Sequence, residues 1–133
     1  AGESSNRKLE RWRRIAEEAV QQSGRSTVPE VEPVRDLPEL PTVDAGEAEV
    51  GLLFHEKALA ERSIGSYLKA GTRRVAIVIG PEGGLSDDEV DILDRRGFNP
   101  VSLGPNVLRT ETAAIYAIAA VQSVYRELVA WKQ

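Results

Sequence analysis

The apolar residues of this chain fall into short continuous runs that alternate with stretches of helical periodicity. Three runs have the length of buried strands, at residues 49–54, 75–79 and 101–103. The second run is apolar throughout and rich in β-branched residues, which is typical of a strand buried on both faces of a parallel sheet. Because helical stretches separate the runs, the sequence predicts an α/β fold with a parallel sheet flanked by helices.

Four stretches with apolar residues at helical spacing are predicted to form helices: residues 7–22, 57–70, 87–96 and 112–131. The third of these has the clearest boundaries, since Ser86 and Glu89 form a capping box and Gly97 follows its last residue. Gly24 and Gly71 likewise follow the first and second helices and are expected to end them.

The last predicted helix is apolar on every side over most of its length. From Ala113 to Val121, only Tyr116 carries a polar group. Such a helix must be buried on more than one side, and its own sheet can cover only one. A second copy of the chain is the simplest cover for the other side, and the small residues of the helix would permit close approach. We therefore expect a homodimer formed through the helix at 112–131.

Two regions are interpreted as solvated surface. Residues 25–46 hold four of the seven prolines, which excludes a long helix or a central strand there. Basic residues cluster near the amino terminus and at Arg73 and Arg74, but the net charge of −4 is unlike that of a stand-alone RNA-binding protein.

The composition narrows the classes of site that the chain can hold. Among its 133 residues there is no cysteine and one histidine, His55. Disulfides, cysteine-based zinc sites and a cysteine nucleophile are thereby excluded, and we expect no bound metal. No apolar run reaches the roughly 18 residues of a membrane span. We therefore expect a cytoplasmic protein that has no contact with membranes.

Two loops that begin with Gly-Pro follow the second and third predicted strands. The first loop, at residues 80–84, contains Gly83 and Gly84, which allow a positive φ and the close approach of another molecule. It lacks the lysine of a phosphate-binding loop, and three carboxylates fill the first turn of the following helix. A cationic or zwitterionic ligand fits these surroundings better than a phosphate does. The alternative is that the two glycines only make a tight turn.

Three segments of the chain together resemble one protein family. They are IGPEGG at 79–84, LGPNVLRTETA at 103–113 and ERWRRIAEEAVQQSGRSTVPEV at 10–31. In these segments the chain resembles the RsmE-type ribosomal RNA methyltransferases of the SPOUT (trefoil-knotted) superfamily. The resemblance implies an enzyme that uses S-adenosylmethionine to methylate N3 of a uridine in small-subunit (16S) ribosomal RNA. It also implies a dimer through the last helix, with the active site near the interface.

The resemblance carries an expectation about domain organisation as well. Residues 1–133 correspond to the SPOUT methyltransferase domain without its first strand and helix, and without the PUA-like RNA-binding barrel that precedes the domain in the family. We therefore expect a fragment in which much of the RNA-binding surface is missing.

By the same resemblance, the cofactor is expected to lie against three loops and the start of the last helix. The implied cofactor-binding residues are Phe54, His55, Ile79, Gly80, Pro81, Glu82, Gly83, Gly84, Leu103, Gly104, Val107, Leu108, Arg109, Thr110, Thr112 and Ala113. A lone histidine at the end of a strand is, alternatively, a helix cap or a surface residue.

The implied catalytic residues are Arg109, Glu82 and Glu111. Arg109 beside a carbonyl oxygen of the base would stabilise the uridine anion as N3 loses its proton, and either glutamate could accept that proton. Alternatively, Arg109 forms an ion pair with one of these glutamates and only braces the loops. Arg109 and Arg25 are the expected RNA contacts, although Arg25 could simply follow the end of a helix.

Two other functions remain open. One is a different SPOUT enzyme, which would methylate a ribose 2′-hydroxyl or a tRNA base. The other is a non-catalytic α/β module that binds adenosine through the two Gly-Pro loops. The Leu-Arg-Thr-Glu-Thr-Ala run at 108–113 favours the uridine-N3 family over other SPOUT enzymes.

Overall fold

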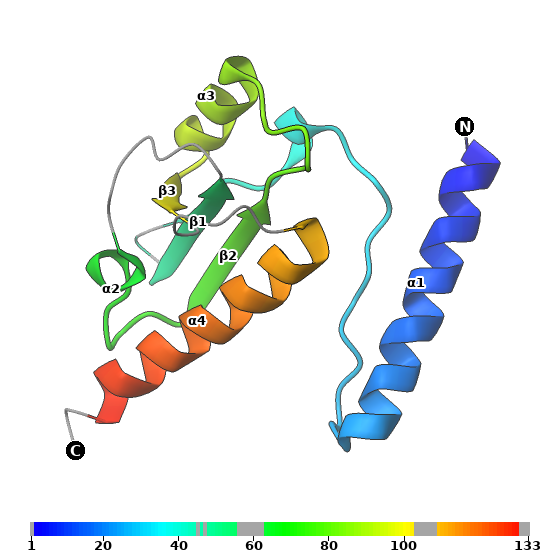
Figure 1. Ribbon diagram of the computed structural model, residues 1–133, viewed down its shortest axis with the longest axis horizontal. Helices are drawn as coiled ribbons and strands as arrows, with labels where there is room; N and C mark the ends of the chain where they lie inside the picture. The colour runs from blue at the N-terminus through cyan, green and yellow to red at the C-terminus, as the bar shows by residue number, and fades with distance from the viewer. Residues whose placement is uncertain (1, 45, 47, 56–62, 103–108, 131–133) are drawn as a thin grey trace. The chain divides into compact units, whose positions relative to one another are not determined.

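A computed structural model describes residues 2–44, 46, 48–55, 63–102 and 109–130 of the chain. The chain divides into two compact units, Ala1–Leu40 and Pro41–Gln133. The second unit holds the sheet and all but one of the predicted helices (Figure 1).

The first unit consists of one helix followed by an extended segment. Helix α1 (Gly2–Ser23) ends where Gly24 adopts a φ of 71°, so the predicted helix and its glycine stop are confirmed. The proline-rich segment then runs extended apart from one 3-10 turn, η1 (Leu37–Glu39), as predicted. The Arg13 side chain ties this segment to α1, because its Nε donates a hydrogen bond to the carbonyl of Val31 at 3.0 Å.

The second unit is built on a three-stranded parallel sheet. Its strands are β1 (Glu49–His55), β2 (Arg74–Ile79) and β3 (Phe98–Ser102), in the order β2-β1-β3. Both strand pairs are parallel, which confirms the predicted sheet. Strand β3 begins three residues earlier than predicted and includes Pro100. Proline lacks an N–H donor, and the outer edge of a sheet, where β3 lies, tolerates that loss.

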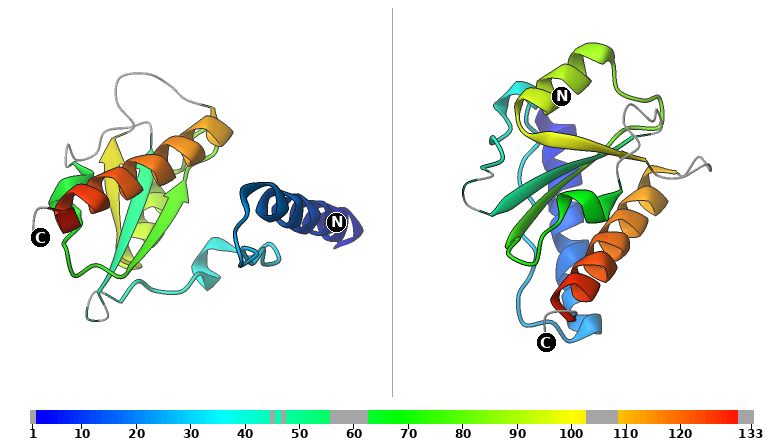
Figure 2. Two further views of the ribbon diagram at one scale, coloured as in Figure 1. Left: turned by 90° about the horizontal axis from the view of Figure 1, so that it is seen from below. Right: turned by 90° about the vertical axis from the view of Figure 1, so that its left-hand side faces the viewer.

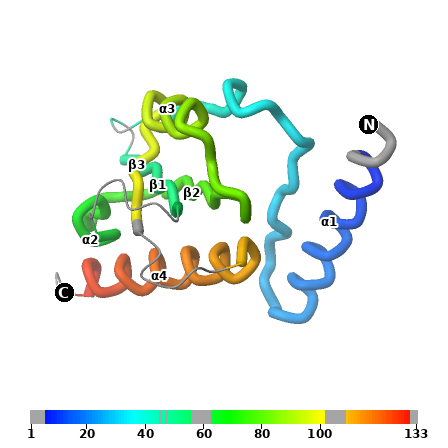
Figure 3. The backbone as a smooth tube through the Cα atoms, turned by 45° about the horizontal axis from the view of Figure 1, so that its top comes forward, coloured from blue at the N-terminus to red at the C-terminus, as the bar shows by residue number. Residues whose placement is uncertain are grey.

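Helices α2 and α4 cover one face of the sheet, and α3 lies against β3 (Figures 1 and 2). Alternation along β1 places Val50, Leu52 and Phe54 on the α4 face and Leu53 on the other. The buried core on the α4 face consists of Leu52, Phe54, Leu68, Val101, Ala117 and Val121. The tube in Figure 3 shows α4 running along this face of the sheet.

Helix α3 (Asp87–Arg95) confirms the local signals read from the sequence. Ser86 Oγ accepts a hydrogen bond from the Glu89 N–H at 3.1 Å, and Glu89 Oε1 accepts one from the Ser86 N–H at 2.9 Å. Gly97 follows the helix with a φ of 91°. Leu93 is fully buried and anchors the helix.

The helix predicted over residues 57–70 is wrong in its second half. Residues 56–62 lie outside the described part of the chain, and the described helix α2 covers only Ile64–Tyr67. Leu68 is extended, with a ψ of 142°, and the chain turns at residues 70–71. The reason is tertiary: Thr72 Oγ1 accepts a hydrogen bond from the Lys69 N–H at 3.0 Å, while Leu68 enters the core. A helix continued to Ala70 would prevent both interactions.

Helix α4 (Thr110–Ala130) begins two residues earlier than predicted. It packs on the sheet and on α2 through Ala113, Ala117 and Val121, which are buried. Its outer side carries Ile115 and Ile118, with exposed fractions of 71% and 52%. The described part of a single chain therefore buries one side of this helix, and the second cover predicted from the sequence stays a prediction.

Candidate functional site

The carboxyl ends of the three described strands lie together at one end of the sheet. This end is called the carboxyl edge here, and it differs from the lateral edges that the outer strands form. The register pairs Phe54 with Ile79 and His55 with Ser102, so the strands end side by side. In open parallel sheets, ligands bind beyond the carboxyl ends of the strands. The structure thus brings the last residues of β1, β2 and β3 side by side, while residues 56–62 and 103–108 lie outside the described part of the chain.

The end of β1 contributes two of the predicted residues in different ways. The side chain of Phe54 is fully buried in the core, so only its backbone is available to a ligand. Its carbonyl accepts a hydrogen bond from the Gly80 N–H at 3.3 Å, which ties β1 to the glycine loop. His55 is also buried, so its interpretation as a surface residue is wrong.

The loop after β2 forms a tight turn that faces solvent. The Gly84 N–H donates to the Pro81 carbonyl at 2.9 Å, and Gly84 has a φ of 79°, as predicted for a glycine here. Gly83 does not take a positive φ. A Cβ added at Gly83 or Gly84 would meet no atom of the described residues within 4 Å, so on that side the backbone is open to an approaching molecule. The tight-turn and ligand-approach interpretations are therefore compatible.

The start of α3 makes this part of the edge acidic. Asp87, Asp88 and Glu89 occupy its first turn, and Glu82 lies exposed in the preceding loop. The capping box already occupies the backbone N–H of Glu89, one of the helix-terminal donors that could bind an anion. A positively charged ligand is favoured here over a phosphate.

The start of α4 supplies the remaining described residues of the predicted site. The Arg109 carbonyl accepts the first helical hydrogen bond, from the Ala113 N–H at 2.8 Å. Arg109, Glu111 and Thr112 are exposed, whereas Ala113 is buried against the sheet. This end of the helix lies beside the end of β2 (Figures 1 and 2).

The bracing ion pair considered for Arg109 is not formed. Within the described ranges, the salt bridges are Arg35–Glu32 and Arg74–Glu49. Neither Glu82 nor Glu111 therefore lies within 4 Å of the Arg109 guanidinium. The three charged groups proposed for catalysis face solvent separately and are available to a substrate.

Several predicted residues cannot be placed at this edge. Leu103, Gly104, Val107 and Leu108 lie outside the described part of the chain. Arg25 belongs to the first unit, where it is exposed directly after Gly24.

Three other predicted residues, Ile79, Gly80 and Thr110, lie at the carboxyl edge itself and are partly buried. The register of β1 with β3 places the backbone of Ser102 opposite His55.

The described residues lack two kinds of feature. No group of three or more His, Cys, Asp or Glu side chains there is arranged to hold a metal ion. Among the same residues, no helix is both long and apolar enough to cross a membrane.

Comparisons with known proteins give a consistent picture. Residues 1–122 match the sequence profile of the RNA methyltransferase domain. The chain is 38% identical over 122 residues to the ribosomal RNA small subunit methyltransferase E of Synechocystis, with 90% of this chain and 40% of that protein covered. It is 36% identical over 123 residues to the Bacillus subtilis protein of the same name, with 88% of this chain and 47% of that protein covered.

Solved structures share this fold. A methyltransferase from Legionella pneumophila with bound SAM superposes with a TM-score of 0.79 and 34% identity, over 92% of this chain and 49% of that one. A ribosomal RNA small subunit methyltransferase E from Neisseria gonorrhoeae, bound to S-adenosylmethionine, superposes with a TM-score of 0.76 and 31% identity, over 92% of this chain and 50% of that one. These neighbours support the SPOUT-type α/β fold, while the knot stays a prediction. The chain spans about half the length of the relatives that it matches.

Proposed function

The chain belongs to the RNA methyltransferase domain family, and from that premise we propose that the carboxyl edge of its sheet binds S-adenosylmethionine. We further propose that the protein methylates N3 of a uridine in small-subunit ribosomal RNA. Two structures with this fold hold that cofactor, and relatives at 36–38% identity are named small subunit methyltransferase E. A cytoplasmic location goes with such a substrate.

The observation that carries the proposal is the open glycine turn in acidic surroundings. No described residue covers the backbone around Gly83 and Gly84, as a cofactor that lies against the main chain requires. S-adenosylmethionine carries a sulfonium and an ammonium group, both of which suit the carboxylates of Glu82 and of the first turn of α3. The residues present therefore fit this cofactor better than they fit a dinucleotide phosphate.

The residues of the chain would have separate tasks in the reaction. When bound, S-adenosylmethionine supplies an electrophilic methyl group, so the protein has to orient the base and stabilise the anion at N3. Arg109 would lie beside a carbonyl oxygen of the uracil and stabilise the developing charge. Glu82 or Glu111 would take the N3 proton, because both carboxylates are exposed and free of ion pairs with described residues.

Calorimetric titration tests the cofactor assignment. S-adenosylmethionine should bind the chain with or without a chelator, whereas ATP and NAD should not. A Cβ at position 83 would meet no described atom within 4 Å, so we expect Gly83→Val to lower cofactor affinity by about tenfold or more with the fold intact. Gly71→Val, equally free of contacts but distant from the carboxyl edge, is the control. Equal binding of ATP and NAD would favour the adenosine-binding module instead.

Methyl transfer tests the role of Arg109. In a chain extended to the length of its relatives, Arg109→Lys should lower transfer to small ribosomal subunits by about a hundredfold, because one lost oxyanion-type donor has that effect. Cofactor affinity should change much less. Arg126→Lys, an exposed arginine farther along α4, is the matched control. Normal transfer by the Arg109 variant would remove this residue from the mechanism.

We also propose that two copies of the chain associate through the outer side of α4. Ile115, Tyr116 and Ile118 have exposed fractions of 71%, 47% and 52%, and such a patch favours association. Ile118→Glu should give a monomer in sedimentation equilibrium, whereas Val34→Glu, at an exposed apolar residue outside α4, should not. Ala117 is unsuitable for this test because it is fully buried against the sheet, and a glutamate there would disrupt the core. A monomeric wild-type chain at micromolar concentration would contradict the proposal.

The domain expectation is also a proposal: the first strand and helix of the methyltransferase domain, and an RNA-binding barrel, lie in sequence outside residues 1–133. Strand β2 supports it, since Val75–Ile79 is apolar on both faces and yet lies at an edge of the described sheet. The present chain should therefore bind ribosomal RNA weakly and with steep salt dependence, and the extended chain tightly. Equal affinities of the present chain and the extended chain for ribosomal RNA would contradict this proposal.

A further inference from the structure

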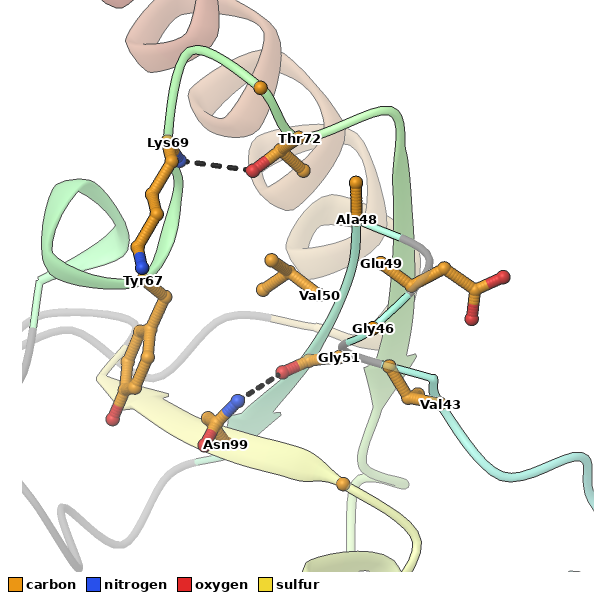
Figure 4. Close-up of a pocket in the computed structure, with 12 residues that line it drawn as sticks. Val43, Gly46, Ala48, Glu49, Val50, Gly51, Tyr67, Lys69, Thr72 and Asn99 are labelled. Carbon is orange, nitrogen blue, oxygen red and sulfur yellow. Dashed lines mark hydrogen bonds between the residues drawn. The ribbon is translucent and has the colours of Figure 1, made fainter.

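A cavity of about 540 Å³ opens at the other end of the sheet, beside the first residues of β1 (Figure 4). Val50 and Gly51 of β1 line it together with Tyr67, Lys69, Thr72 and Asn99. The pairing of β1 with β3 begins only at Gly51 and Phe98, so Val50 has no β3 partner and faces this space. Ligand pockets in proteins commonly have volumes of about 300–1,000 Å³, so the cavity is large enough for a small molecule.

The polar groups of the cavity are held in defined orientations. Asn99 Nδ2 donates a hydrogen bond to the Gly51 carbonyl at 3.0 Å, which leaves its Oδ1 as an acceptor. Thr72 Oγ1 accepts from the Lys69 N–H at 3.0 Å, so its hydroxyl proton can be donated elsewhere. The Tyr67 hydroxyl contacts the Pro100 carbonyl at 3.4 Å and holds the ring at the wall.

Two charged side chains, Lys69 and Glu49, line the cavity. The carboxylate of Glu49 points away from the space and is shared between Arg74, at 3.3 Å, and the Asp44 N–H, at 3.1 Å (Figure 4). The ammonium of Lys69 has no salt bridge to any described residue. An anionic group can therefore be bound beside Lys69 without a competing carboxylate.

These features define the ligand by its chemistry. Thr72 lies at one end of the cavity and Asn99 with Gly51 at the other, while the Lys69 side chain extends from the Thr72 end toward Tyr67 (Figure 4). A ligand that spans it needs an anionic acceptor at the first end, a hydrogen-bond donor at the second, and a planar body for the Tyr67 ring and Val50. We propose that this cavity binds a nucleoside monophosphate unit, with its phosphate at Lys69 and Thr72 and its base at Tyr67 and Asn99.

This site is distinct from the carboxyl edge. Gly51 and His55 are separated by four residues of β1, which is about 13 Å at the rise of a parallel strand. The unit could be a free mononucleotide or one nucleotide of an RNA chain, and both present the same groups. The proposal does not depend on the proposed methyl transfer, because it rests on the geometry at the start of β1 alone.

Nuclear magnetic resonance of the ¹⁵N-labelled chain provides the test, because the side-chain amide of Asn99 is a direct reporter. AMP, adenosine and a five-nucleotide RNA are titrated separately, each with S-adenosylmethionine in excess so that adenosine does not report on the carboxyl edge. AMP or the RNA should shift the Asn99 side-chain amide and the Gly71 and Thr72 amides. Adenosine, which lacks the phosphate, should bind about tenfold more weakly.

Two variants separate binding in the cavity from surface attraction. Gly71 lines the cavity and a Cβ there meets no atom within 4 Å, so Gly71→Leu should fill the space with the fold intact and abolish the shifts. Lys69→Gln should weaken phosphate binding a few-fold, since this lysine is exposed, and Arg73→Gln, also exposed but outside the cavity, is its control.

Each outcome of these titrations either supports the proposed nucleotide site or overturns it. Shifts with AMP identify a mononucleotide site, and shifts with the RNA alone identify a site for one nucleotide of a longer strand. No shift with either, or shifts that persist in Gly71→Leu, would overturn the proposal. Equal effects of Lys69→Gln and Arg73→Gln would overturn it as well, because they would indicate diffuse attraction by surface charge.

Discussion

The two edges of this sheet are built differently. At the end of the sheet where the strands begin, here called the amino edge, hydrogen bonds join segments distant in the sequence: Val43 N–H to the Arg96 carbonyl and Arg73 N–H to the Ala48 carbonyl, both at 2.9 Å. At the carboxyl edge, the charged side chains of Glu82, Arg109 and Glu111 face solvent and form no salt bridge with described residues. We infer that the amino edge stabilises the fold, whereas the carboxyl edge leaves its functional groups available to a ligand.

The largest loss of stability should come from a side chain added where segments distant in the sequence cross at the amino edge. A Cβ at Gly51 would lie 2.7 Å from the Gly97 carbonyl oxygen and 3.1 Å from the Phe98 Cα. These are backbone atoms of β3 and the turn before it, so Gly51→Val should lower the free energy of unfolding by about 3 kcal/mol or more. Urea denaturation followed by circular dichroism measures this loss.

The control for that variant is Gly71→Val, because its Cβ meets nothing within 4 Å although Gly71 lies at the same edge. We expect it to change stability by less than about 0.5 kcal/mol. If Gly51→Val were equally harmless, the amino edge would not be the rigid part of the sheet.

A smaller effect is expected at the start of α3, the part of the carboxyl edge that is fixed by local hydrogen bonds. Ser86→Ala removes the acceptor for the Glu89 N–H and should cost about 1 kcal/mol. Glu89→Gln keeps an acceptor for the Ser86 N–H and should cost less than half of that. The same denaturation experiment distinguishes them, and equal losses would mean that charge, not capping, stabilises this turn.

The smallest effect should come from the surface ion pair at the amino edge. Arg74 is largely exposed, so Arg74→Gln should lower stability by no more than about 0.5 kcal/mol. Glu49→Ala should cost more, because Glu49 is partly buried and also accepts from the Asp44 N–H. A larger loss for Arg74→Gln would show that this edge depends on its ion pair more than on its backbone crossings.

The sequence predicts those features that depend on neighbouring residues. Ser86, Glu89 and Gly97 fix the ends of α3 through contacts within a few positions, and all three behave as predicted. The apolar run at 75–79 likewise gives strand β2 within one residue. The end of α2 was missed because Leu68 leaves the helix to fill the core, which is a contact with Ala117 and Val121 far along the chain.

The location of the candidate site at the carboxyl edge was predictable from the sequence, but the side chains that face a ligand there were not. Strand ends and glycine loops locate it, because parallel strands bring their carboxyl ends together. Which groups then face a ligand depends on packing: Phe54 and Ala113 are buried, whereas Glu82 and Arg109 are exposed. The cavity beside Asn99 had no signal in the sequence, because it arises from the offset between the starts of β1 and β3.

The central claim is that the cofactor binds at the carboxyl edge of the sheet. The direct measurement is a titration of the ¹⁵N-labelled chain with S-adenosylmethionine alone, followed through the backbone amides. We expect shifts at Gly80, Gly83 and Gly84 and at Thr110–Ala113, with the amides of Gly51 and Gly71 unchanged. Shifts centred on Gly51 and Gly71, or none at all, would contradict the account.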